Sequence, residues 1–348
     1  MKNQSGNAKA QKRKTTIVSI PCGLLFICLV VFALGCEDKG QRPILTDSDG
    51  TRISPIRGQA FQIIQAALAD PRAEARVHAI EVVVTTRQIR FMPSVQRLLQ
   101  DKVVPVRFAA AVAVGDMEYS IAEKVVSPLL RDGDHNVIIA AAYAMGRLGY
   151  PEYFEVVRKG LDSDDQTVRA NAALILGRMG DPGSLPLLKR AQEDKDSGDK
   201  VRFQVLEARA RLRDETVLQK LWAIALSGYA DDRVMGVRAL GALGTSKARD
   251  ILVTKLDDSV LEVRLAAAEQ LGKLRDTTGE PEVLAVFEKN LTSGMAPQAG
   301  ERVNVLTALA IGEIRTPGLT KYLPRLLKNE SKSVRIAAAK AVFLCGMR

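Results

Sequence analysis

The sequence is poor in the residue types that build most catalytic and metal sites. Its 348 residues include two histidines, one tryptophan and four cysteines, and aromatic residues make up only 5%. Neither His78 nor His135 has a second histidine or a cysteine at metal-ligand spacing. Glycine-rich phosphate loops of the Walker and dinucleotide-binding types are missing as well. We therefore predict that the protein is not an enzyme and uses no metal and no cofactor.

The excess of positive charge is too small to indicate nucleic-acid binding. The chain has 50 basic and 40 acidic residues, a net charge of +10, but five of the basic residues and none of the acidic ones lie within residues 1–36. Without that segment the balance is 45 basic against 40 acidic residues, or +5. A protein that neutralises many phosphates needs a concentrated basic surface. We expect no nucleic-acid partner.

Residues 1–36 have the form of an export signal, since a basic segment is followed by 19 uncharged residues at 17–35. The segment ends Phe-Ala-Leu-Gly-Cys36, which resembles a bacterial lipobox, although that family prefers leucine where Ala33 stands. The resemblance implies that Cys36 is acylated and anchors the chain in a membrane of the cell envelope. Glu37, where aspartate would favour the inner membrane, implies an outer-membrane location facing the periplasm.

Two alternatives to the lipid anchor stay open. The uncharged stretch is close to the ~20 residues that span a bilayer, so it could remain as an uncleaved anchor. It could also be cleaved and the protein released. Residues 37–57 combine charged residues, Gly, Pro and Ser without any period, which is typical of a flexible tether. After processing, Cys345 would be the one remaining thiol, so we expect no disulfide framework.

The rest of the chain is dominated by a repeat, of which TVRANAALILGRMG at 167–180 is the clearest copy. With Arg169 as the reference position, the pattern returns mostly at steps of 31 residues; the equivalent positions are Arg76, Arg107, Ile138, Arg202, Arg233, Arg264, Asn304 and Arg335. The next residue is always apolar, the third is nearly always small, and the eighth is glycine in six of nine copies. This spacing indicates helices packed closely in a repeating array.

A second apolar helix precedes each of these helices, and a polar turn separates the two. The turn carries a capping-type residue six positions before the reference, at Asp70, Asp101, Asp132, Ser163, Ser227, Asp258 and Asn329. Each unit is therefore predicted as helix A, turn, helix B. Two units carry extra residues in this turn, near 192–200 and 292–301, on the same edge of the array; such insertions are either tolerated surface loops or part of a binding face.

The pattern resembles HEAT repeats, in particular the short HEAT-like repeats of phycobilisome lyases. Residues 162–181 and 257–276 carry the resemblance best, and it covers about residues 58–348. It implies an all-α, right-handed solenoid of about nine two-helix repeats whose B helices line the concave side. It also implies that the repeated arginine pairs with a turn aspartate of a neighbouring unit, for which Asp101, Asp132, Asp164 and Asp258 are suitably placed.

A candidate interaction surface lies in the middle of the B-helix ridge. Val112, Tyr143 and Leu174 occupy one column of the repeat, and Asn171, Arg147 and Arg178 border them. An apolar centre with arginines at its rim and one tyrosine is typical of a protein-binding hot spot. We predict that these six residues bind a protein partner. The alternative is that superhelical curvature partly buries them.

The last helix, 334–345, keeps Ile336, Val342, Phe343 and Leu344 although it ends the array. Terminal repeats normally need a polar outer face, so we expect self-association there or a partner that covers the end. Taken together, the sequence predicts a membrane-tethered HEAT-repeat scaffold that mediates protein–protein interactions in the bacterial cell envelope. The alternatives are a bilin-lyase-type enzyme and a nucleic-acid-binding HEAT protein.

Overall fold

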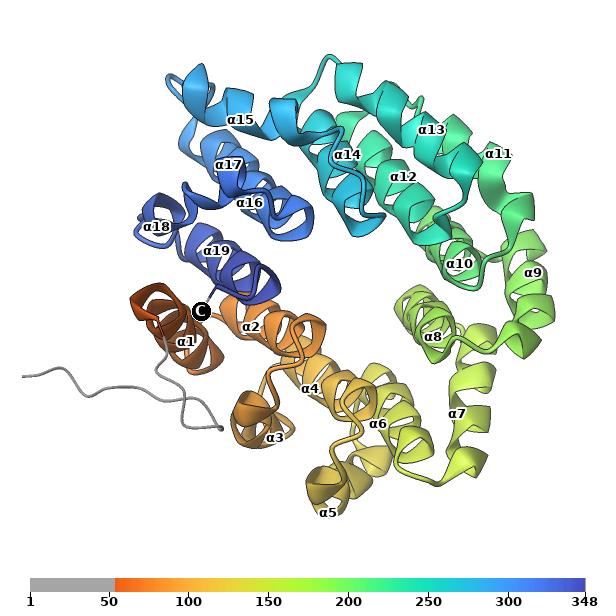
Figure 1. The fold of residues 1–348 in the computed structure, drawn as a ribbon. Helices are drawn as coiled ribbons and strands as arrows, with labels where there is room; N and C mark the ends of the chain where they lie inside the picture. Colours follow the sequence, from red (N-terminus) through yellow and green to blue (C-terminus); the bar gives the residue numbers. More distant parts are fainter. Residues whose placement is uncertain (1–53, 348) are drawn as a thin grey trace, which may run out of the picture. The chain divides into compact units, whose positions relative to one another are not determined.

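The computed structural model describes residues 54–347, and this part of the chain is helical without strands (Figure 1). Nine long inner helices are the predicted B helices: α2 (Ala73–Thr85), α4 (Val104–Asp116), α6 (His135–Arg147), α8 (Gln166–Met179), α10 (Asp199–Arg211), α12 (Ala230–Leu243), α14 (Leu261–Lys273), α16 (Pro297–Ile314) and α19 (Lys332–Leu344). The predicted all-α solenoid of nine two-helix repeats is confirmed for these residues.

The A helices are shorter, and 3-10 turns extend several of them. They are α1 (Pro55–Leu68), α3 (Met92–Leu98), α5 (Glu123–Val126), α7 (Phe154–Lys159), α9 (Leu185–Glu193), α11 (Leu218–Ile224), α13 (Ser246–Thr254), α15 (Glu280–Glu288) and the pair α17 (Pro317–Thr320) and α18 (Leu323–Leu326). Helix α1 begins three residues before the predicted boundary at 58, because Ser54 accepts a hydrogen bond from the Arg57 N–H and Pro55 starts the helix. The predicted export signal, including Cys36, lies outside the described residues.

The seven residues of the capping column act in the turn, three residues before the start of seven of the nine B helices, all except α10 and α16. Each side chain accepts a hydrogen bond from the N–H two residues ahead, as Asp101 does from Val103 at 2.9 Å and Asp258 from Val260 at 3.0 Å. This is the local bond that lets Asp, Asn and Ser favour turns. The column therefore fixes the chain reversal between helices A and B.

Four arginines of the column are structural in the way that the resemblance implies, since each pairs with an aspartate of the next turn; they are Arg76, Arg107, Arg169 and Arg233. Arg107 donates twice to Asp132, at 2.8 Å each, and also to its own turn at the Asp101 carbonyl, 2.8 Å. Arg233 makes the same bidentate contact with Asp258, and Arg76 bonds to Asp101. Each arginine thus ties its own turn to the next one. The charge of each of these guanidinium groups is paired with an aspartate, so they do not form a phosphate-binding ladder.

One predicted arginine partner is wrong. Asp164 pairs with no arginine of the column, because the unit before it has Ile138 at the reference position. Arg169 pairs with Asp194, at the regular spacing of 25 residues, and also donates to the Ser197 hydroxyl at 2.9 Å. Both partners belong to the turn between α9 and α10, so the extra residues of that turn leave the regular pair in place and add the contact with Ser197.

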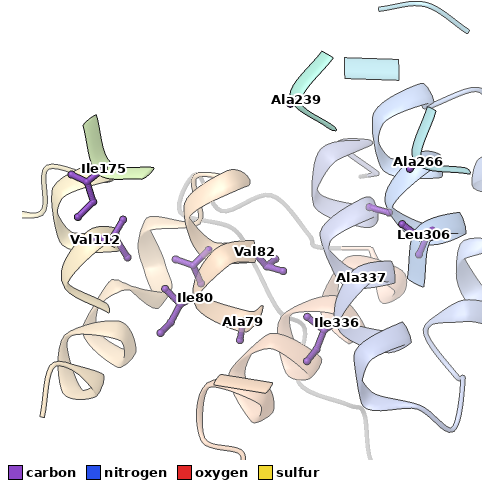
Figure 2. Close-up of a cluster of buried hydrophobic side chains, with 14 of the residues drawn as sticks. Ala79, Ile80, Val82, Val112, Ile175, Ala239, Ala266, Leu306, Ile336 and Ala337 are labelled. Carbon is purple, nitrogen blue, oxygen red and sulfur yellow. The ribbon is translucent and has the colours of Figure 1, made fainter. Parts of the chain in front are cut away.

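The first and last helices pack against each other, which the sequence did not indicate. Helix α19 contacts both α1 and α2, so the described repeats close on themselves. The Phe61 and Phe343 rings meet at 5.0 Å between centroids, and Lys332 Nζ lies 2.5 Å from Asp70 Oδ2. Figure 2 shows Val82 of α2 beside Ile336 of α19, with Val112 of α4 on the other side of α2. We call the α1–α2–α19 contact the seam.

The prediction of an uncovered apolar end is therefore wrong. Ile336 and Val342 of α19 are buried by α1, α2 and α16, and Phe343 is only 8% exposed. At the seam, the hydrogen bond from Lys332 lowers the pKa of Asp70 to about 2. The physical reason given for self-association, an exposed terminal helix, is absent because the chain covers that helix itself.

A helix with the length and hydropathy of a membrane span is not found among residues 54–347.

Candidate functional site

The B helices enclose a cavity of about 1740 Å³, whose lining we call the inner wall. All B helices except α6 contribute to it, together with the end of α11. Its ionisable side chains are balanced in sign, apart from His78: the basic ones are Arg178, Lys200, Arg202, Arg211, Arg238, Lys273 and Lys340, and the acidic ones are Glu81, Asp116, Asp199, Glu207, Asp232, Glu269 and Glu313. A wall of mixed sign does not attract a polyanion.

An apolar groove of about 410 Å³ runs along one side of this wall, between α2, α4 and α8. Val77 and Val84 of α2, Phe108 and Val112 of α4, and Leu174 of α8 form its sides. Between α4 and α8 in the array comes α6, but of its residues only Asn136 lines the groove. The result is a largely apolar depression between two consecutive B helices, α2 and α4, and a third, α8, that does not follow them directly.

Polar contacts bridge the groove from α8 to the earlier helices. Arg178 Nη1 donates to Asp116 Oδ2 at 2.5 Å, although 62 residues separate the two in sequence. Asn171 Nδ2 donates to Asn136 Oδ1 at 2.9 Å. These bonds hold α8 against α4 and α6 and keep the width of the groove fixed, so the site is formed before any partner binds.

Tyr143 supports the groove from beneath. Its ring is 1% exposed, and its hydroxyl donates to Asp116 Oδ1 at 2.6 Å. Burial, together with the neighbouring Asp116 carboxylate, raises the pKa of the Tyr143 hydroxyl. Gly115 makes room for the ring, because a Cβ at that position would lie 2.7 Å from Tyr143 Cε1. Tyr143 therefore orients the aspartate that holds Arg178.

Four of the six predicted partner-binding residues line this groove: Val112, Asn171, Leu174 and Arg178. The prediction of an exposed ridge is wrong for Tyr143, which α4 and α6 bury completely, and Val112 is only 6% exposed. The prediction is also wrong about the position of Arg147, which pairs with Glu118 and does not line the groove. Partner binding itself stays a prediction, now restricted to the four groove residues.

A second cluster on the inner wall was not singled out from the sequence. Glu269 and Gln270 of α14 are 4% and 3% exposed, and each has a buried polar atom without a hydrogen-bond partner in the described structure, Oε2 and Nε2 respectively. Lys273 Nζ donates to the other oxygen of Glu269 at 2.7 Å. Burial raises the pKa of Glu269, but Lys273, Arg238 and Lys340 outweigh it and lower the pKa overall. The carboxylate is therefore ionised at neutral pH.

Neither a metal-ligand cluster nor a reactive thiol is found among the described residues. Among residues 54–347, no group of three or more His, Cys, Asp or Glu side chains could hold a metal ion. Burial raises the pKa of the Cys345 thiol to about 11, so it is protonated at neutral pH and a poor nucleophile.

Comparison with known proteins identifies the repeats. A family model described as HEAT repeats matches residues 122–200, 155–235 and 227–298, which together span just over half of the chain. No curated protein matches the chain.

Similar solved structures include human deoxyhypusine hydroxylase in complex with glycerol. The two proteins are 18% identical, the match covers 84% of this chain and 98% of the hydroxylase chain, and the TM-score is 0.36. The CpcE–CpcF complex of phycocyanin lyase from Nostoc sp. PCC7120 shares 18% identity over 72% and 93% of the two chains, with a TM-score of 0.39. Importin beta shares 16% identity over 83% and 47%, with a TM-score of 0.35. At these scores the similarity supports no inference about activity or partner.

Proposed function

The chain belongs to the HEAT-repeat family, and from that premise we propose that it is a protein-interaction scaffold held at the bacterial cell envelope by a lipid on Cys36. The inner wall is the binding surface. The observation that carries the proposal is the preformed apolar groove between α2, α4 and α8. It offers a partner a water-shielded place for an apolar side chain and polar groups at its edges.

The groove favours a protein segment over the alternative ligands. Among the described residues, Arg178 is the one basic side chain that lines the groove and it pairs with Asp116, and the wall around the groove has as many acidic as basic side chains. An apolar side chain that enters the groove loses its contact with water, while the Asp116–Arg178 and Asn136–Asn171 contacts remain available at the rim. This combination suits a partner segment with one large apolar residue flanked by polar ones.

We expect that Leu174→Glu abolishes capture of the partner. Leu174 is half-buried at the side of the groove, so a carboxylate there would be desolvated by any apolar side chain that enters. The full-length protein and the variant would be purified from membranes of the producing cells after chemical crosslinking. Bound proteins would be quantified by mass spectrometry.

Ile121→Glu is the matched control, because Ile121 is exposed and lines neither the groove nor the cavity. A protein that is lost with Leu174→Glu and retained with Ile121→Glu supports the groove as the binding site. Equal recovery with both variants, while circular dichroism shows both to be folded, would place binding elsewhere and refute the proposal.

The membrane tether is tested separately. In a diderm bacterium fed a labelled fatty acid, we expect the full-length protein to incorporate the label and to fractionate with the outer membrane. Cys36→Ala should lose the label, whereas Cys345→Ala should keep it. If the wild-type protein carries no label and remains in the soluble fraction, the lipid anchor is wrong, and the scaffold acts without one.

A further inference from the structure

The second cluster on the inner wall has the chemistry of a ligand site. Arg238 of α12 is exposed to the cavity, and among the described residues it has no ion-pair or hydrogen-bond partner. The neighbouring cations are already paired, Lys273 with Glu269 and Lys340 with Glu81. Glu313 of α16, the other carboxylate beside these lysines, pairs with Arg315 at 3.8 Å. Within residues 54–347, Arg238 is therefore the cation without a paired anion at this part of the wall.

The unpartnered atoms of α14 lie next to this arginine. Arg238 and Gly241 are one turn apart on the same face of α12. The Gln270 side chain packs against Gly241, because a Cβ at Gly241 would lie 2.8 Å from Gln270 Cβ. Glu269 is near enough to Arg238 for the guanidinium to lower its pKa. An unmatched cation, a buried amide donor and a buried carboxylate acceptor thus share one part of the cavity.

A buried polar atom without a hydrogen-bond partner lowers the stability of the folded protein, and a ligand that forms a hydrogen bond with that atom removes the loss. The free groups here need a carboxylate for Arg238, an acceptor for Gln270 Nε2 and a donor for Glu269 Oε2. The last residue of a polypeptide supplies all three, since its two carboxylate oxygens and its backbone N–H lie on either side of one Cα atom. The exposed Arg238 side chain and the flexible Lys273 side chain can rotate to admit it.

We propose that the Arg238–Glu269–Gln270 cluster binds the free C-terminal carboxylate of a partner polypeptide. The proposal rests on the function proposed above and specifies the kind of partner. Arg238 pairs with the carboxylate, Gln270 donates to it, and Glu269 accepts from the terminal backbone N–H. The groove between α2, α4 and α8 lines another part of the same inner wall and remains available for a side chain of the same partner.

The test uses two pools of six-residue peptides with randomised sequences that lack Asp and Glu. One pool ends in a free carboxylate and the other in a carboxamide, and both are passed over the immobilised full-length protein in detergent. We expect enrichment from the free-acid pool only. The affinity of an enriched peptide would then be measured by fluorescence anisotropy. We expect the amide of that peptide to bind the wild-type protein at least about tenfold more weakly than the free acid does, and the free acid to bind Arg238→Gln more weakly by the same factor.

Two further variants separate binding from folding. Arg302→Gln removes an exposed arginine that does not line the cavity, and it should leave peptide affinity unchanged. Gln270→Met keeps the approximate shape but removes the unpaired donor, so it should weaken the peptide while the melting temperature stays equal or rises.

Three results would overturn the proposal. These are equal binding of acid and amide, unchanged affinity of Arg238→Gln, and no enrichment from either pool. A peptide amide that gains affinity from an internal aspartate, tested as a separate synthetic peptide, would show that a side-chain carboxylate is the true ligand. None of these results depends on the Leu174→Glu experiment. Partner binding in the groove can therefore be supported even if the carboxylate site is refuted.

Discussion

Asp101→Ala should reduce the free energy of unfolding by about 3–5 kcal/mol, because it leaves the buried Arg76 guanidinium without a counter-ion and with only the carbonyls of its own turn as acceptors. The two side chains are 8% and 10% exposed, and Arg76 Nη2 lies 2.9 Å from Asp101 Oδ1. The substitution also removes the acceptor for the Val103 N–H in the turn before α4. Urea denaturation, together with hydrogen exchange of α2 and α4, measures the loss.

Asp162→Ala provides the matched control for this prediction. Asp162 pairs with Arg190 at 2.7 Å, but these side chains are 60% and 59% exposed. An exposed pair of this kind contributes at most about 1 kcal/mol. If the two alanine variants lose the same stability, the repeated arginine does not act as a buried connection between turns.

Phe343→Ala should open the seam and cost about 3–5 kcal/mol, since it removes a large side chain from a packed interface. Phe343 packs against Phe61 of α1, which in turn contacts the Phe91 ring at 5.8 Å between centroids. Spin labels at the exposed Gln62 and Lys328 would report the distance across the seam. We expect a short, narrow distribution for the wild type and a longer, broader one for the variant.

The control for the seam is Phe287→Ala. Phe287 stacks on Tyr322 at 3.9 Å in the outer helices, away from α1. This variant should lose stability but keep the short label distance. A seam that stays closed in Phe343→Ala, or one that is already open in the wild type, would contradict the closed arrangement of the repeats.

The sequence specified the helices well because each repeat contacts mainly its neighbours. The arginine and aspartate columns, the turn signals and the 31-residue spacing are local patterns, and the structure reproduces them. Closure depends on the small rotation between successive repeats, summed over the whole array. No single repeat encodes that sum, so the contact of Phe61 with Phe343, across more than 280 residues, could not be predicted.

The sequence predicted only part of the site, because the burial of a side chain also depends on how neighbouring repeats pack. Reading the repeat by columns assumes that the same position is exposed in every B helix, which places Tyr143 beside Val112 and Leu174. The Tyr143 ring is buried instead, because it packs against Gly115 of α4 and its hydroxyl bonds to Asp116. A large tyrosine among alanines, opposite a glycine, is the signal that could have revealed this burial. The sequence gives no such signal for Gln270, because the missing hydrogen-bond partner of its Nε2 is evident only when the neighbouring helices are in place.

Photocrosslinking from the inner wall tests the central claim most directly. A photoreactive amino acid would be placed at Leu174 in the groove beside the inner wall or at Glu155 on the exposed surface of α7, in the full-length protein in its native membranes. We predict that a discrete partner band forms from Leu174 only. Bands of equal strength from both positions, or a band from Glu155 alone, would contradict the proposal that the inner wall holds the partner.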